Sequence, residues 1–167
     1  MTLAVTVAVV VLLAIYITWT AGRLDRMHSR VDAAWAALDA QLVRRAAAAR
    51  ALVTVLPPGP EATALDVAAH DALDAGEDHR AELENALSRA LKAATPLLPA
   101  DPGVEVLAAE LETASTRVGL ARSFHNGTVN DTRALRFRRL PRALRLAGNR
   151  VMPVGFDIDD TALAGAA

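Results

Sequence analysis

The chain has 167 residues, a formal net charge of −1, 4% aromatic residues and no cysteine. This length allows one domain and a membrane anchor, and the near-zero total charge gives no indication of nucleic-acid binding or of an acidic tail. The lack of cysteine excludes a disulfide framework, a thiol nucleophile and a cysteine-based metal site. Because β-sheets favour branched and aromatic side chains, an alanine-rich chain with few aromatic residues is better suited to closely packed helices.

The chain opens with an uncharged segment from Thr2 to Ala21, which reads TLAVTVAVVVLLAIYITWTA. As a helix, 20 residues span about 30 Å, the thickness of the hydrocarbon core of a bilayer. Tyr16 and Trp19 lie toward its C-terminal end, where aromatic residues meet the membrane interface. A cleaved signal peptide would need a basic start and a shorter apolar run, so we predict a transmembrane helix over residues 2–21.

Basic residues follow this segment directly, at Arg23, Arg26 and Arg30, whereas only the α-amino group precedes it. Positively charged flanks of a transmembrane helix stay in the cytoplasm. The predicted localisation is therefore the cell membrane, as a single-pass protein with its N-terminus outside and its domain in the cytoplasm.

From Arg23 to Leu56 the chain contains no Gly or Pro. Apolar or small residues recur there at alternating steps of four and three, with Arg45 as the one polar interruption: Val31, Trp35, Leu38, Leu42, Arg45, Ala49, Leu52 and Leu56. This heptad-like stripe is typical of a helix that packs on its neighbours at a shallow angle, as in a coiled coil. We expect the transmembrane helix to continue into this helix without a break, until Pro57 and Pro58 end it.

Two further helical stretches follow along the chain. The first covers Glu61 to Leu98, and Gly76 predicts a kink or break within it. The second runs from Val104 to about Arg138, with apolar or small residues spaced by three and four throughout. Asp101 is its expected N-cap and Pro102 its expected first residue.

The predicted fold class is all-α, because no segment alternates with period two over the length of a strand. The N-terminal transmembrane helix, residues 2–21, continues into an antiparallel helical bundle at residues 23–150. The bundle has three long helices plus a short fourth at 142–149, since short Pro/Gly turns make successive helices run up and down. Residues 151–167 are expected to form an extended or disordered tail.

The chain carries none of the common catalytic motifs, such as G-x-S-x-G, a Walker loop or H-E-x-x-H. Its histidines, at positions 28, 70, 79 and 125, form no set with metal-ligand spacing. His125 falls on the apolar stripe of the last long helix, where it is either a buried histidine or, given an oriented partner, a general base. We predict no catalytic residue, no cofactor and no metal site.

Arg44 and Arg45 lie in the middle of the first helix, near Asp39 and Gln41. Arg45 falls on the core stripe, so its stem can lie along apolar surface while the guanidinium reaches a carboxylate. One interpretation is an ion pair between helices, and the other is a binding site for a partner.

The strongest charge anomaly is a segment with seven arginines and no acid, formed by Arg133, Arg136, Arg138, Arg139, Arg142, Arg145 and Arg150. These arginines either neutralise the acidic residues of 61–84 or contact anionic lipid headgroups, at about 1 kcal/mol for each basic residue near the surface. A nucleic-acid contact is the least favoured interpretation, because no recognition fold or aromatic platform accompanies the charge.

Residues 23–45 read R-L-D-R-M-H-S-R-V-D-A-A-W-A-A-L-D-A-Q-L-V-R-R. With the preceding apolar span, the elements V-D-x-A-W, L-D-x-Q-L and R-R resemble the LemA family in order and spacing. A second block at 110–129 resembles the family's later helix through E-L-E, Arg117, Ala121-Arg122, Asn126 and Val129. Leu140-Pro141 stands where the family has an aromatic-Pro turn.

The chain departs from the family pattern at several positions and is identified as a divergent member. Ala47, Arg50 and Ala51 replace an acid, a Pro and an Asn, while Ala114-Ser115 replaces Thr-Glu and His125 replaces a Tyr. The resemblance implies an anchored antiparallel helical bundle. It implies no enzymatic activity, because the family has none that could be transferred.

The sequence thus favours a membrane-anchored interaction or scaffold protein without catalytic activity. Its expected partners are the bilayer, through residues 2–21, and an unidentified protein; a homo-oligomer is open and nucleic acid is not expected. A membrane-associated enzyme or enzyme subunit that uses His125 or Arg44 and Arg45 is the first alternative. Lipid binding through the arginines of 133–150 is the second.

Overall fold

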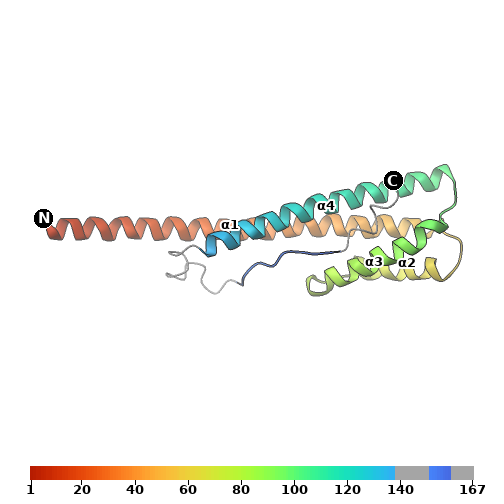
Figure 1. Cartoon of the computed structure of the whole chain (residues 1–167), viewed down its shortest axis with the longest axis horizontal. Helices are drawn as coiled ribbons and strands as arrows, with labels where there is room; N and C mark the ends of the chain where they lie inside the picture. The colour runs from red at the N-terminus through yellow and green to blue at the C-terminus, as the bar shows by residue number, and fades with distance from the viewer. Residues whose placement is uncertain (138–150, 159–167) are drawn as a thin grey trace. The chain divides into compact units, whose positions relative to one another are not determined.

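The computed structural model describes residues 1–137 and 151–158, and within these ranges the chain is all-helical with no strand (Figure 1). Four α-helices follow one another: α1 (Thr2–Val53), α2 (Pro60–Leu73), α3 (Arg80–Ala94) and α4 (Pro102–Arg136). Two single 3₁₀ turns, η1 (Glu77–His79) and η2 (Thr95–Leu97), flank α3. The all-α class predicted from the sequence is therefore confirmed.

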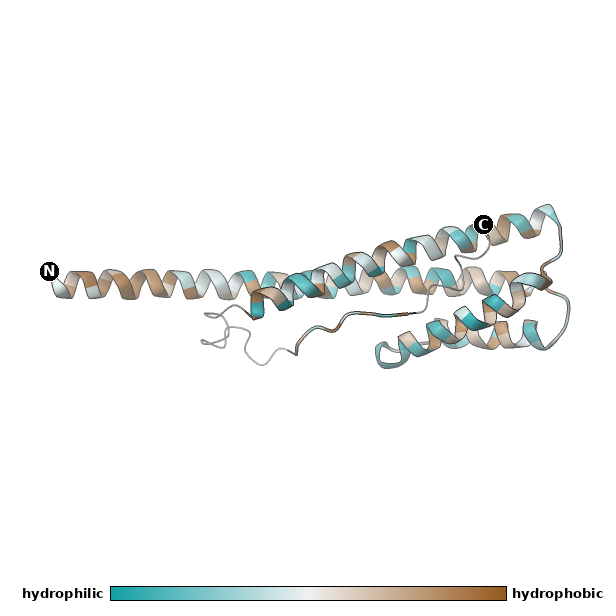
Figure 2. Cartoon of the chain, in the orientation of Figure 1, coloured by the Kyte–Doolittle hydropathy of each residue, from teal (hydrophilic) through white to brown (hydrophobic). Residues whose placement is uncertain are grey.

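The apolar segment and the first core helix form one unbroken helix, since α1 runs for 52 residues from Thr2 to Val53. This confirms the predicted continuity. Residues 1–16 are all exposed, and the apolar side chains are concentrated in this first part of α1 (Figure 2). By length and composition, α1 is the one helix in the described ranges that could cross a membrane, and no residue of its apolar window is buried.

The end of α1 falls at Val53, three residues earlier than the apolar stripe suggested. The amides of Thr54, Val55 and Leu56 each bond to the carbonyl three residues before them, so the last turn tightens from α to 3₁₀ geometry. The cause is Pro57, whose ring disfavours helical backbone at the residue that precedes it. Leu56 is nevertheless buried, as its place on the stripe predicted.

The expected second long helix is two helices, α2 and α3, so the prediction of three long helices is wrong on this point. α2 ends at Leu73, where the Asp74 amide still bonds to the carbonyl of His70. Gly76 then adopts an extended backbone, with φ −77° and ψ 165°. Gly76 therefore marks a break and not a kink, and the 3₁₀ turn η1 leads directly into α3.

The start of α4 has the predicted capping. Asp101 precedes Pro102, the first helical residue, and its Oδ1 accepts a hydrogen bond of 2.7 Å from the Gly103 amide. A side-chain oxygen in this position satisfies one of the amides that a helix start leaves without a partner. The predicted stripe of α4 is buried or half-buried from Val104 to Leu135.

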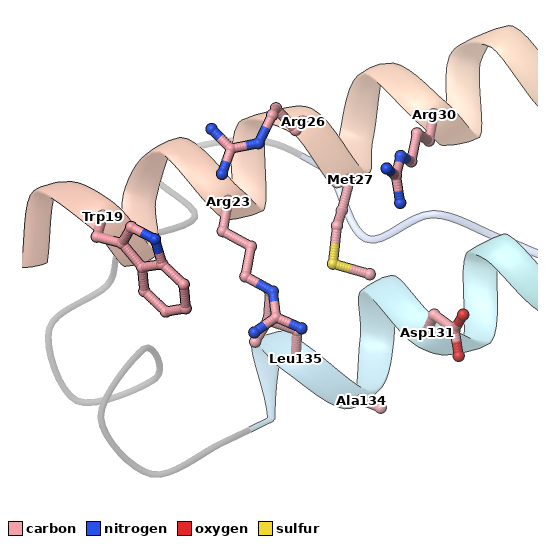
Figure 3. Close-up of a pocket in the computed structure, with 8 residues that line it drawn as sticks. All are labelled: Trp19, Arg23, Arg26, Met27, Arg30, Asp131, Ala134 and Leu135. Atoms are coloured by element: carbon pink, nitrogen blue, oxygen red, sulfur yellow. The ribbon is translucent and has the colours of Figure 1, made fainter. Parts of the chain in front are cut away.

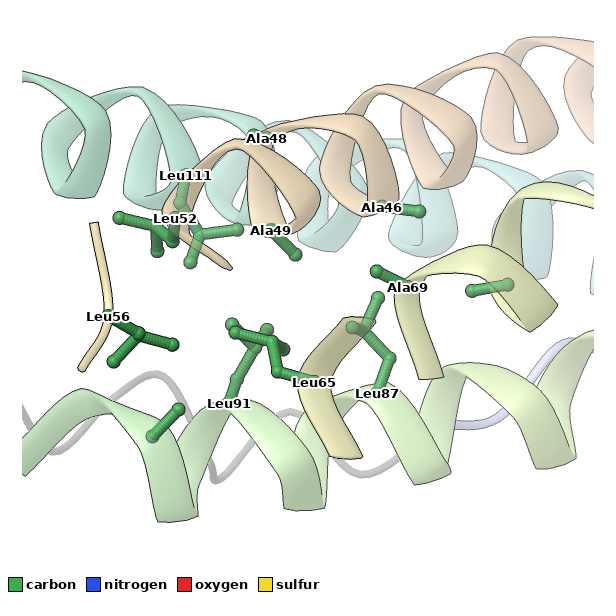
Figure 4. Close-up of a cluster of buried hydrophobic side chains, with 12 residues drawn as sticks. Ala46, Ala48, Ala49, Leu52, Leu56, Leu65, Ala69, Leu87, Leu91 and Leu111 are labelled. Atoms are coloured by element: carbon green, nitrogen blue, oxygen red, sulfur yellow. The ribbon is translucent and has the colours of Figure 1, made fainter. Parts of the chain in front are cut away.

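The chain divides into two compact units, and the division falls within α1 and α4. The second unit contains residues 36–124 and the core cluster of the chain (Figure 4). Leucines of all four α-helices meet in this cluster, among them Leu52, Leu65, Leu87, Leu91 and Leu111. Small residues such as Ala46, Ala49, Ala69, Ala72 and Ala94 fill the rest of it. Because alanine buries little area itself but lets backbones approach closely, the leucines supply most of the apolar area removed from water.

The first unit contains residues 1–35 and 125–155. In it, Leu24 and Val31 of α1 and Val129 and Leu135 of α4 are buried. Thr132, also fully buried, donates its hydroxyl to the carbonyl of Thr128 at 2.8 Å, so its polar group is satisfied within α4.

Part of the prediction lies outside the described residues, namely the short fourth helix at 142–149 and the tail beyond residue 158. Residues 151–158 have no helix or strand, but Phe156 and Ile158 are buried. The carbonyl of Ile158 accepts a 2.7 Å hydrogen bond from Arg122. This part of the expected tail therefore packs on the protein.

Candidate functional site

The second unit contains a cluster of charged and polar side chains around Arg45, which we call the ionic cluster: Asp39, Arg45, Arg80, Glu84 and Ser88. Asp39 is half-buried and the other four are buried. Arg45 lies on the apolar stripe of α1 and is 1% exposed. Its Nη1 is 3.2 Å from Oε2 of Glu84, and its Nη2 donates a 2.7 Å hydrogen bond to Oγ of Ser88. Arg45 thus forms the ion pair between helices that was one of its two interpretations.

Arg80, the first residue of α3, forms the second half of the ionic cluster. Its Nη1 donates a 2.6 Å hydrogen bond to the carbonyl of Ala72 in α2, and its Nη2 forms an ion pair with Asp39 of α1. Arg80 therefore connects α1, α2 and α3 at one point. Helix α2 ends at Leu73, one residue after Ala72, so the carbonyl of Ala72 is one that the helix end leaves open.

Burial raises the pKa of Glu84 from its ordinary value of 4.5 to about 7, although Arg45 and Arg80 both act to lower it. Desolvation dominates because the carboxyl group has lost its contact with water. Oε1 of Glu84 has no hydrogen-bond partner within the described ranges, so only one of its two oxygens is stabilised.

A carboxyl group with a pKa near 7 has the proton affinity of a general acid or base. Glu84, however, is 0% exposed and meets Arg45 directly, so a substrate has no access to it. Arg44, next to Arg45 in the sequence, is exposed. Arg44 and Arg45 therefore do not form one site, because Arg44 is exposed and Arg45 is buried. The ionic cluster is a structural element of the core.

His125, the candidate base of the first unit, is 3% exposed and packs edge-on against Trp35. The two ring centroids are 5.6 Å apart at an interplanar angle of 61°, which is a favourable aromatic arrangement. Nδ1 of His125 has no hydrogen-bond partner in the part of the chain that the structure describes. A general base needs an orienting partner, and this geometry supports the buried-histidine interpretation.

The basic segment is described only at Arg133 and Arg136, while Arg138, Arg139, Arg142 and Arg145 lie outside the described residues. Arg133 donates to the carbonyl of Pro153 at 2.8 Å, and Arg136 donates to that of Val151 at 3.0 Å. These two arginines therefore bind the backbone that follows the basic segment. The sequence offers no signal for this role, because any carbonyl can accept such a bond.

His28 is linked to the same group. Its Nδ1 is 2.9 Å from the carbonyl of Leu24, and its Nε2 is 3.5 Å from Nη1 of Arg136. Since a carbonyl can only accept, the Nδ1–H group of His28 donates to Leu24.

A hollow of about 580 Å³ lies in the first unit, just after the apolar part of α1. We call it the juxtamembrane hollow; its lining includes Trp19, Arg23, Arg26 and Arg30 of α1 and Asp131 and Leu135 of α4 (Figure 3). The guanidinium of Arg23 lies 5.7 Å from the centre of the Trp19 ring, in a cation–π contact. In the sequence these three arginines served only as a signal for orientation. Their spacing of three and four residues, which places them on one helix face, is the signal that could have identified the hollow.

No group of three or more His, Asp or Glu side chains within the described ranges could hold a metal ion. Comparison of the chain with protein-family models, with curated proteins and with solved structures finds no match. The function must therefore be argued from the helices and from these side chains, and the LemA resemblance rests on its two sequence blocks.

The contribution of the Arg45 ion pair to stability can be tested by comparing a substitution of Arg45 with the same substitution of its exposed neighbour, Arg44. Replacing Arg45 with Met should reduce the free energy of unfolding by about 3–5 kcal/mol, because it leaves the Glu84 carboxyl buried without its cation. Arg44→Met, the matched control one residue away, should change it by less than about 0.5 kcal/mol. The measurement is urea unfolding of the full-length chain in detergent, followed by circular dichroism. Equal effects of the two substitutions would contradict the assignment.

The free energy of unfolding should fall as the pH rises, because folding raises the pKa of the Glu84 carboxyl group. Folded Glu84 keeps its proton up to about pH 7, whereas the unfolded chain releases it near 4.5. Its contribution to stability is therefore present below pH 4.5 and is lost as the pH rises through 7, by roughly 3 kcal/mol for the full shift.

Glu84→Gln cannot titrate, so the unfolding free energy of the natural chain minus that of this variant should fall across this pH range. Urea unfolding at a series of pH values measures the difference. Glu82→Gln, an exposed position on the same helix, is the control, for which the difference should stay nearly constant. A constant difference for Glu84→Gln as well would show that Glu84 is not the titrating group.

Proposed function

We propose that this chain is a single-pass membrane protein whose helical domain binds protein partners as a scaffold, without catalytic activity of its own. The observation that carries the proposal is α1, in which an exposed apolar half continues without a break into a half that supplies core residues. Monomeric soluble proteins rarely expose so large a contiguous apolar surface. A bilayer around the first half removes that surface from water.

The proposed arrangement is an antiparallel helical bundle, attached to the membrane by residues 2–21 and lying in the cytoplasm. Short connections between α1, α2, α3 and α4 support the bundle, because short links make successive helices antiparallel. Arg23, Arg26 and Arg30 support the cytoplasmic side. The LemA resemblance agrees with both parts and belongs to the same proposal.

The partner-binding surface is proposed on the exposed side of α4, where Val106, Leu120 and Phe124 are 67%, 68% and 68% exposed. Leu120 and Phe124 are one turn apart, and Val106 lies five turns before Phe124, so all three share one face of the helix. Large apolar side chains at such spacing are the anchors by which helices dock into apolar grooves. The proposed occupant is a protein with an apolar groove, and a second copy of this chain is the competing occupant.

The buried polar groups are consistent with this proposal. The ionic cluster bonds within itself, and His125 packs against Trp35. These groups contribute to folding and are inaccessible to a substrate. The enzyme alternative would need an open polar pocket around one of them.

The membrane anchor can be tested by charge. Ten Leu, Ile and Val residues between Thr2 and Ala21 favour insertion by about 3–6 kcal/mol, and each Arg at the centre costs about 2.5–3.5 kcal/mol. Replacing Val10 and Leu13 together with Arg should therefore abolish insertion and release the protein from membranes at alkaline pH. Val67→Arg, at an exposed apolar position of α2, is the control and should stay in the membrane. Retention of both variants would contradict the anchor.

The interaction surface can be tested by photo-crosslinking in the native membrane. Benzoylphenylalanine in place of Leu120 or Phe124 should give a discrete adduct of higher mass, because these side chains face the proposed partner. The same probe at Glu112 or Asn130, exposed positions on another side of α4, should give none.

The adduct should disappear when Val106→Glu is added, since a carboxylate would then enter the apolar face. An adduct of twice the mass of the chain would show that the partner is a second copy of this chain and not a different protein. Equal labelling from all four positions would remove α4 as the specific surface.

A further inference from the structure

The juxtamembrane hollow has a net charge of +2, from three arginines against Asp131. Within the described residues, none of these three arginines forms an ion pair, and Arg23 has its cation–π contact with Trp19. Elsewhere in the described ranges the buried arginines are paired with acids, as Arg45 and Arg80 are. Three arginines that line one hollow exceed its single acid, Asp131, and such an excess of positive charge favours binding of an anion.

The position of the hollow along α1 determines which anion can reach it. If Ala21 ends the hydrocarbon core, the helical rise places Arg23 about 3 Å beyond it, Arg26 about 7 Å and Arg30 about 13 Å. The headgroup layer on each side of a bilayer is roughly 5–7 Å thick. Arg23 therefore falls within the headgroup layer, Arg26 lies at its outer edge, and the long side chain of Arg30 can extend back toward that edge.

The lining of the hollow changes along the same direction. Figure 3 shows Trp19 and Leu135 at the end nearer the apolar segment, and Arg30 with Asp131 at the other end. A tryptophan ring favours the boundary between acyl chains and headgroups, and Leu135 offers apolar contact at the same depth. The arginines offer planar groups that bind phosphate through two parallel hydrogen bonds.

We propose that the juxtamembrane hollow binds the phosphate of an anionic phospholipid, held by Arg23, Arg26 and Arg30 with its glycerol backbone against Trp19 and Leu135. The volume of 580 Å³ is within the usual range of small-ligand pockets. The inference rests on the proposed membrane anchor, and it assigns lipid recognition to residues 23–30, not to the basic segment 133–150.

The charge balance of the hollow sets the preference among lipids. Three arginines exceed one carboxylate, so a lipid with a net negative charge is favoured over a zwitterionic lipid, whose positive group would meet the same arginines. At about fivefold for each basic residue, equivalent to about 1 kcal/mol, the arginines together give a preference of up to roughly 100-fold.

Trp19 supplies a direct reporter, because it lines the hollow and the chain has only one other tryptophan. The full-length chain with Trp35→Phe is reconstituted in phosphatidylcholine vesicles. Brominated phosphatidylglycerol or brominated phosphatidylcholine then quenches Trp19, and the ratio of their apparent affinities measures the preference. We expect phosphatidylglycerol to bind several-fold more tightly.

Two sets of variants separate the hollow from general charge. Arg23→Gln, Arg26→Gln and Arg30→Gln together should bring the ratio close to one. Arg44→Gln, Arg89→Gln and Arg117→Gln, at exposed positions outside the hollow, remove the same charge and should leave the ratio high. Asp131→Asn should raise the ratio, because it removes the one acid of the hollow. Equal ratios for the two triple variants would overturn the proposal.

Two further experiments test whether the bound phosphate belongs to a lipid and whether residues 2–21 anchor the chain in a membrane. An excess of inorganic phosphate should not displace brominated phosphatidylglycerol; displacement would show that the hollow is a site for soluble anions and would overturn the lipid assignment. Flotation with pure phosphatidylcholine vesicles tests the anchor independently of the headgroup. A protein that fails to float refutes the proposed anchor, whereas one that floats without lipid preference refutes only the hollow.

Discussion

The apolar surface of the first half of α1 is the constraint on which the rest of the chain depends. Residues 1–16 have no protein around them, yet they belong to the same helix as Leu38, Leu42 and Leu52, which are buried in the core. The helix continues through Gly22, which lies between its apolar half and its core half. One helix thus supplies both an exposed apolar surface and part of the buried core.

The arginines of the chain lie in two different environments. Arg45 and Arg80 are removed from water and meet Glu84 and Asp39, so their charge contributes to the packing of α1, α2 and α3. Arg23, Arg26 and Arg30, at the end of the apolar segment, stay exposed and line a hollow that holds a single acid, Asp131. The same side chain thus acts as an internal connector in one unit and as an anion-binding group in the other. Arginine suits both roles because its charge is permanent and its donors are arranged in a fixed plane.

The continuity of α1, the stripe of α4 and the cap at Asp101 could be predicted from the sequence, since they depend on local spacing and on the absence or presence of Pro and Gly. The partners of Arg45 could not. Glu84 and Ser88 lie about 40 residues away, and periodicity does not specify which faces of two helices meet. The break at Gly76 was ambiguous for a similar reason, because a glycine permits both a kink and an interruption. The burial of Phe156 also depends on tertiary packing alone.

The position of Arg45 among alanines has a further consequence for how α1 is seated on α2 and α3. Ala46, Ala48 and Ala49 are nearly identical in shape, so steric fit alone would discriminate poorly against a helix that slides along its axis. A slip of one turn would move Arg45 by about 5.4 Å, out of reach of Glu84 and Ser88, and would leave a charge buried without a partner. The ion pair therefore constrains the axial register of α1 in addition to the buried leucines of the same helix.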